Sequence, residues 1–160
     1  VSYIDSIGFS CDDIIDLRGW VRAFEETGEA IYVGVYTTFR HDGVGYVTLN
    51  AVRERLGRAP LGIDDDGFDD LGHEVDTILL HQLVPEMAET IAPYNLVVFV
   101  DAHVGHVPQR IYEEELDVCY RPATVSHTLH PCSVLALCEE LHGHAPRGVL
   151  LSIRGYDYDF

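Results

Sequence analysis

The chain has 160 residues, and its 10 Lys and Arg residues against 27 Asp and Glu residues give a formal net charge of −17. This length predicts one domain with a substantial core. The negative charge would repel nucleic-acid phosphates and anionic lipids, so we expect neither as a partner. No apolar run approaches the roughly 20 residues that span a bilayer, and we therefore expect no membrane insertion.

The cysteines and the first residues indicate a cellular location. The four cysteines form no CxxC pair, which is typical of a reduced protein. The start of the chain, VSYIDSIGFSCDD, has neither a basic n-region nor a continuous apolar h-region, so we expect no secretory signal. The expected location is the cytoplasm.

The first part of the chain predicts a helix ahead of the first strand. Residues 11–28 place four apolar side chains on one helical stripe and end at Gly28, a residue that commonly follows a helix. The stripe consists of Ile14, Leu17, Val21 and Phe24. We therefore divide the chain into an N-terminal helical extension, residues 1–29, and an α/β domain, residues 30–160.

Strands and helices alternate along the rest of the chain. Strands are expected over 30–36, 77–83, 96–102, 110–116 and 148–160, and helices over 44–56, 85–92 and 131–143. The expected apolar stripes are Val44, Val47, Ala51, Val52 and Leu56 in the first of these helices and Val134, Leu137, Cys138 and Leu141 in the last. The alternation predicts a single-domain α/β fold with a central, mostly parallel, twisted sheet of about five strands flanked by helices. Residues 110–116 are typical of an exposed acidic edge strand, and residues 62–74 of a solvated acidic loop.

A carboxylate ends the most apolar of these strands. Asp101 follows the run LVVFV, and an isolated ionised carboxylate beside apolar surface is costly without a partner. Ligands of open α/β sheets bind at the carboxyl ends of the strands. Asp101 is therefore a candidate ligand-binding residue, or alternatively a cap of the following turn.

Two further polar segments lie near predicted strand or helix ends. In RHDGVG, residues 40–45, Asp42 is either a helix N-cap or a ligand. In SHTLHP, residues 126–131, His127 and His130 are either surface or helix-start residues, or ligands. The ends of the first and third strands of a parallel sheet lie on the same edge. Asp42 and Asp101 together with His127 then form a mixed oxygen and nitrogen site for a divalent metal, and the absence of thiolate ligands argues against a closed structural zinc site.

Five segments follow one another in a particular order. They are HDGVG (41–45), HQLVPEMAETIA (81–92), LVVFVDA (96–102), SHTLHPCSVLALCEELHGHAP (126–146) and LLSIRGYDYDF (150–160). This order resembles that of the nickel–iron hydrogenase maturation endopeptidases. Members of that family have a GNPLxxDDGVG-like turn, a strand that ends in VDA, and an SHxLxP element that opens a helix.

The resemblance implies a function and a site. It implies a cytoplasmic metal-dependent peptidase that removes the C-terminal extension of a hydrogenase large subunit after nickel insertion, so the partner is the large subunit or its precursor. Matched residue by residue, the family's nickel-recognising positions are Asp42, Asp101 and His127. The nickel would arrive with the substrate, although the same ligand types also suit zinc.

The first turn departs from the family pattern. Residues 35–38, VYTT, stand where the family has Gly-Asn-Pro, and His41 replaces the first of its paired acids. No GxSxG motif is present and no cysteine has a marked nucleophile context, which favours activation of water by a carboxylate or as a metal-bound hydroxide. Asp42 and Asp101 are the candidate catalytic residues, and His41 is either an additional base or exposed. The alternatives are a non-hydrolytic family member that binds a hydrogenase subunit or precursor, and an unrelated small metallohydrolase.

Overall fold

The computed structural model describes residues 31–36, 44–103, 108, 111–122 and 129–154. Its elements are β1 (Ile31–Tyr36), α3 (Val44–Arg55), the 3₁₀ turn η2 (Phe68–Asp70), β2 (Val75–Leu80), α4 (Met87–Ile91), β3 (Leu96–His103), β4 (Ile111–Leu116), α5 (Pro131–His142) and β5 (Arg147–Arg154). The predicted single-domain α/β class is confirmed over these residues. The predicted helix 11–28, and with it the extension 1–29, lies outside the described residues.

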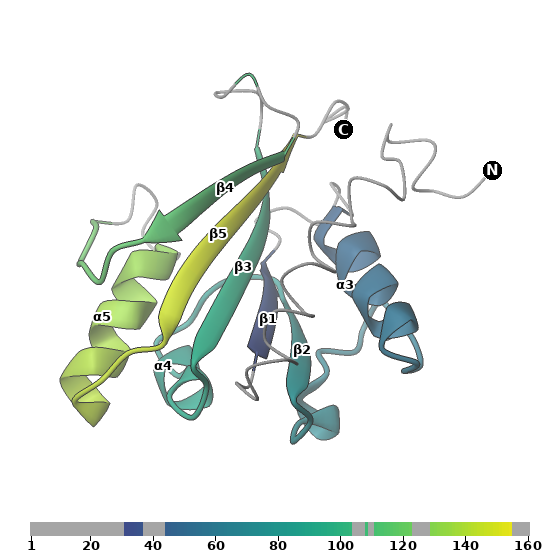
Figure 1. The fold of residues 1–160 in the computed structure, drawn as a ribbon, viewed down its shortest axis with the longest axis horizontal. Helices are drawn as coiled ribbons and strands as arrows, with labels where there is room; N and C mark the ends of the chain where they lie inside the picture. The colour runs from purple at the N-terminus through teal and green to yellow at the C-terminus, as the bar shows by residue number, and fades with distance from the viewer. Residues whose placement is uncertain (1–30, 37–43, 104–107, 109–110, 123–128, 155–160) are drawn as a thin grey trace.

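The strands form one sheet in the order β2-β1-β3-β5-β4, with β3 at its centre (Figure 1). The pairs β1–β2, β1–β3 and β3–β5 are parallel, and β4 is antiparallel to β5 at the edge of the sheet. The central position of β3 explains its continuous apolar run, because a strand covered on both faces has no polar side.

Helices cover both faces of the sheet (Figure 1). Along β3, Leu96, Val98 and Val100 belong to the buried cluster that includes residues of α3, whereas Val97 and Phe99 belong to the cluster that includes α4 and α5. This alternation is the period of two residues that a strand imposes on its side chains. The fold is therefore a three-layer sandwich of helix, sheet and helix.

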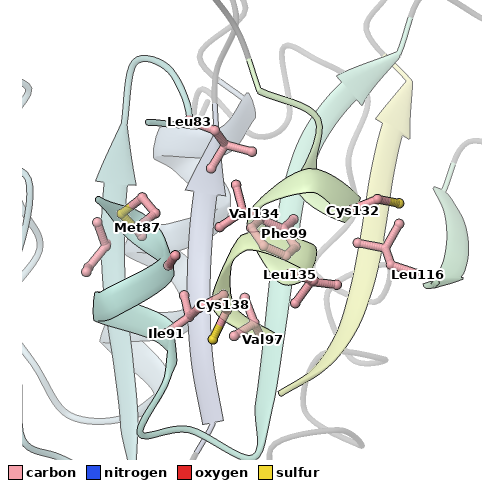
Figure 2. Close-up of a cluster of buried hydrophobic side chains, with 12 residues drawn as sticks. Leu83, Met87, Ile91, Val97, Phe99, Leu116, Cys132, Val134, Leu135 and Cys138 are labelled. Carbon is pink, nitrogen blue, oxygen red and sulfur yellow. The ribbon is translucent and has the colours of Figure 1, made fainter. Parts of the chain in front are cut away.

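Figure 2 shows the buried apolar cluster between the sheet and the helices α4 and α5. Val134 and Leu135 of α5 lie against Phe99 of β3, and Met87 and Ile91 extend the cluster from α4. Leu135, Phe99, Met87 and Ile91 are among the largest fully buried side chains of the described residues. The apolar contact of α5 with the central strand therefore fixes that helix over the sheet.

Gly148 permits the close approach of α5 to β5. A Cβ atom at this position would lie 2.4 Å from Cδ1 of Leu135. We expect Gly148→Ala to reduce the free energy of unfolding by about 1–3 kcal/mol through overpacking, as measured by urea denaturation. Leu135→Ala removes the clashing side chain, so the double variant should lose less than the sum of the two single losses. If the losses of unfolding free energy in the two single variants were fully additive in the double variant, the contact between position 148 and Leu135 would be contradicted.

The predicted helix stripes are partly wrong. In α3 the buried apolar residues include Leu49 and Val52, whereas Val47 is only half-buried. In α5 Leu135 is fully buried and Leu141 is 58% exposed. Periodicity alone does not show how far a helix extends beyond the sheet that it covers. The last turn of α5 is exposed throughout, so an apolar residue there has no core to enter.

Element boundaries also shift from those predicted. β2 begins at Val75, which pairs with Ile31, and it ends before His81, so the prediction of 77–83 is displaced toward the C-terminus. β4 is the predicted edge strand, and its Glu113 and Glu115 are exposed. Residues 155–160 of the last predicted strand lie outside the described residues. No helix in the described part of the chain is both long enough and apolar enough to cross a bilayer.

Candidate functional site

Asp101 lies near the carboxyl end of the central strand. It follows the buried residue Val100 in β3 and is itself half-buried. The alternation along β3 places Asp101 on the same face as Val97 and Phe99, the face covered by α4 and α5. The sequence therefore places a carboxylate where the apolar core of this face ends.

Two hydroxyl residues share this part of the face. Ser152 of β5 is the register partner of Asp101, and Tyr112 of β4 is the register partner of Ser152. Ser152 is buried and Tyr112 is half-buried. Partners in register on neighbouring strands point to the same face of a sheet, so Asp101, Ser152 and Tyr112 form one polar row across three strands. Sequence reasoning did not identify Ser152 or Tyr112; the available signal was a serine within the apolar run VLLSI.

The other predicted site residues, His41, Asp42 and His127, lie outside the described residues. The structure does describe the strands and helices that precede and follow them. β1 and β3 are parallel neighbours, with Val35 opposite Val100, so their carboxyl ends are at the same edge of the sheet. By sequence, the RHDG segment joins the carboxyl end of β1 to α3, and SHTLHP joins the residues after β4 to α5.

His130 has a structural role at the start of α5. It is the N-cap residue, and its Nδ1 accepts a hydrogen bond of 3.1 Å from the backbone nitrogen of Cys132. Burial, and then the nearby positive charge of Arg121, lower the pKa of His130. A neutral ring can accept this bond through Nδ1, whereas an imidazolium cannot. Of the alternatives weighed for His130, the helix-start residue is confirmed.

One residue of the acidic loop, Asp70, is held by ion pairs. Asp70 Oδ2 accepts hydrogen bonds of 2.7 Å from both Arg53 and Arg58, and Oδ1 lies 3.0 Å from Nε2 of His73. Arg53 is buried and also donates to Thr77 of β2 at 2.8 Å. Most of residues 62–74 are exposed, as predicted for a solvated loop, and two arginines from distant positions in the sequence tie Asp70 of this loop to α3 and β2.

The ion pairs of Asp70 predict an acid-sensitive contribution to stability. Hydrogen bonds from Arg58, and then from Arg53, hold the pKa of Asp70 well below its usual range. As the pH falls, the Asp70 carboxyl group is therefore protonated at a higher pH in the unfolded chain than in the folded protein. The contribution of Asp70 to the free energy of unfolding is present above the pKa of the unfolded chain, about 4, and is lost as the pH falls below that value. We expect Asp70→Asn to lower the melting temperature at pH 7 and to have a smaller effect at pH 3. The matched control is Asp69→Asn in the exposed neighbouring position; an equal loss for Asp70→Asn at both pH values would contradict the assignment.

Asp76 is a buried carboxylate with a structural role. Asp76 of β2 is fully buried and accepts hydrogen bonds from the backbone nitrogens of Gly72 and His73 and from the Tyr94 hydroxyl. Burial, followed by the bond to Asp76, raises the pKa of Tyr94. These bonds connect β2 with the loops before it and after α4. Within the described ranges, no group of three or more His, Cys, Asp and Glu residues is arranged to hold a metal ion.

Comparison with solved structures identifies a protein with a similar fold. No family model matches the sequence, and no curated protein matches it. The fold is similar to the crystal structure of the NiFe hydrogenase maturation protease HycI from Thermococcus kodakarensis KOD1, with 24% sequence identity and a TM-score of 0.45. The match covers 79% of this chain and 74% of that chain.

Proposed function

We propose that this protein is a cytoplasmic endopeptidase that removes the C-terminal extension of a nickel–iron hydrogenase large subunit after nickel insertion. The observation that carries the proposal is the pairing of β1 with β3. These parallel neighbours end at one edge of the sheet, and the two motifs that contain Asp42 and Asp101 follow or end those same strands. The five sequence segments in the family order supply independent support.

In this proposal Asp42, Asp101 and His127 recognise the nickel ion carried by the substrate. Two carboxylate oxygens and one imidazole nitrogen suit a borderline divalent metal. Recognition of the metal positions the precursor, so that only a nickel-loaded large subunit is cleaved. Zinc also accepts these ligand types and could replace nickel in binding measurements.

The chemistry assigned to the protein is activation of water by a carboxylate. Asp101 or Asp42 accepts a proton from water, the water oxygen attacks the scissile carbonyl carbon, and the C–N bond breaks as the leaving amine is protonated. Asp101 is half-buried beside Phe99 and Ser152 in the sheet, and partial exclusion of water strengthens electrostatic interactions in such a position. Ser152 and Tyr112 provide hydroxyl groups on the same face.

The direct test is incubation with nickel-loaded precursor followed by mass analysis of its C-terminus. The expected result is loss of the C-terminal extension from nickel-loaded precursor, with no loss from metal-free precursor. A matched reaction without the protein controls for spontaneous cleavage. Equal processing of the two precursor forms would contradict recognition of nickel, and an intact precursor in every reaction would contradict the peptidase.

A second candidate function follows from His41. The family has an acid at this position, and a histidine there removes one carboxylate from the first turn. A protein with this turn could bind the large subunit or its precursor without cleaving it. Association of the intact precursor with this protein, measured by gel filtration without any change of mass, would favour binding over hydrolysis.

A further inference from the structure

Two cysteines that are separated in the sequence meet at the start of α5. The thiols of Cys119 and Cys132 are close enough for a hydrogen bond with Cys119 to contribute to the raised pKa of Cys132. Cys132 is completely buried, while Cys119 is half-buried and packs against the same apolar cluster. Figure 2 shows Cys132 beside Leu116, the last residue of β4, which shortly precedes Cys119 in the chain. Both cysteines are free thiols.

The backbone around the two thiols is held by a second set of contacts. The hydroxyl of Ser133, next to Cys132, accepts a hydrogen bond of 3.0 Å from the backbone nitrogen of Arg121 and donates one of 3.2 Å to the Arg121 carbonyl oxygen. The backbone nitrogen of Cys132 donates to Nδ1 of His130. These bonds fix the segment after β4 against the first turn of α5, so the two thiols meet in the folded state.

The two cysteines differ in burial and in their charged neighbours. Burial, followed by the hydrogen bond with Cys119, raises the pKa of Cys132 to about 11. A hydrogen bond with Cys119 is the largest cause of the raised pKa of Arg121, so its guanidinium group lies beside the Cys119 sulfur, and Arg121 itself is exposed. A cation at this position stabilises negative charge that develops on sulfur during exchange reactions. Cys119 is thus the accessible thiol, and Cys132 is the protected partner behind it.

We propose that Cys119 and Cys132 form a reversible disulfide when the folded protein meets a peroxide. The Cys119 sulfur attacks one peroxide oxygen, the O–O bond breaks, and Cys119 becomes a sulfenic acid with release of water. The Cys132 sulfur then attacks the sulfur of Cys119, the S–O bond breaks, and a second water leaves with the thiol proton. The two cysteines together lose two electrons, and hydrogen peroxide is reduced to two water molecules. Excess small-molecule dithiol reverses the reaction by exchange.

The test uses the reduced, folded full chain exposed to hydrogen peroxide and then labelled with N-ethylmaleimide in denaturant. Maleimide-reactive thiols should fall from the four cysteines of the chain to two. Peptide mass analysis should find Cys119 joined to Cys132, and dithiothreitol should restore all four reactive thiols. Labelling of both Cys119 and Cys132 after peroxide treatment would overturn the proposal, as would a bond from either one to Cys11 or Cys138.

Variants separate this pair from general oxidation. Cys119→Ser should retain three reactive thiols after peroxide treatment, because this variant lacks the thiol that the proposal pairs with Cys132. Cys138→Ala should still form the Cys119–Cys132 bond; Cys138 is buried elsewhere on α5, with its thiol directed to the carbonyl oxygen of His144 at 3.5 Å. Peroxide treatment in urea gives a second measurement that does not depend on the folding of any variant. Selective Cys119–Cys132 pairing should disappear there, and its persistence would overturn the role of the folded geometry.

Discussion

Asp101→Asn is expected to reduce cleavage of nickel-loaded precursor by about 10²–10⁴-fold, the usual contribution of a general acid or base. Asparagine retains the shape of the side chain but cannot take up a proton from water, and it is a weaker metal ligand than a carboxylate. Initial rates of C-terminal processing, followed by mass spectrometry, measure the effect. The fold should persist because the apolar residues before Asp101 supply the core of β3.

The matched control for this substitution is Glu89→Gln, which removes an exposed carboxylate from α4. It should leave the cleavage rate unchanged. Urea denaturation of Asp101→Asn distinguishes function from stability, since a functional carboxylate contributes little to the core. If Asp101→Asn gave no soluble protein, Asp101 would be a structural cap of the following turn. If the variant cleaved precursor at an unchanged rate, Asp101 would not be a catalytic residue.

His41→Asp is expected to accelerate precursor cleavage, by up to the 10²–10⁴-fold range of one general base. The substitution restores the acid that the family has next to Asp42. Binding of the precursor should change little, because the proposed nickel-recognising residues are retained. Single-turnover cleavage rates and the dissociation constant for precursor, measured separately, distinguish chemistry from recognition.

His41→Ala is the control for this second substitution, because it removes the imidazole without adding a carboxylate. It should not accelerate cleavage. Rapid nickel-dependent cleavage by the unmodified protein would refute the proposal that His41 slows the cleavage step. Tight association without cleavage by either the unmodified protein or His41→Asp would favour the binding-only function.

Local sequence signals were sufficient for several elements of the fold. The apolar run that begins at Leu96 predicted the central strand because burial on both faces removes the need for polar side chains. Pro131 and Gly143 marked the ends of α5, where the proline is the first helical residue and the glycine adopts a left-handed conformation with φ of 75°. These features depend on neighbouring residues, so the local sequence predicts them without knowledge of the tertiary contacts.

Features that depend on distant residues were not predictable in the same way. Asp70 is held by Arg53 and Arg58, which are 17 and 12 residues away in the sequence. Ser152 is placed beside Asp101 by the register of β3 and β5, and no local pattern specifies a register between distant strands. For the candidate site, the sequence indicated Asp101 by its position after an apolar strand but not the hydroxyl residues on the adjoining strands.

The position of β5 has a consequence for synthesis of the protein. β5 lies between β3 and β4, both of which precede it in the chain. As the ribosome extends the chain, one backbone edge of β3 and the pairing edge of β4 therefore lack their native partner until residues 147–154 emerge. Unpaired strand edges are sites of intermolecular association. The nascent chain is thus most exposed to aggregation before β5 inserts between β3 and β4. A chaperone would protect the chain best during this interval.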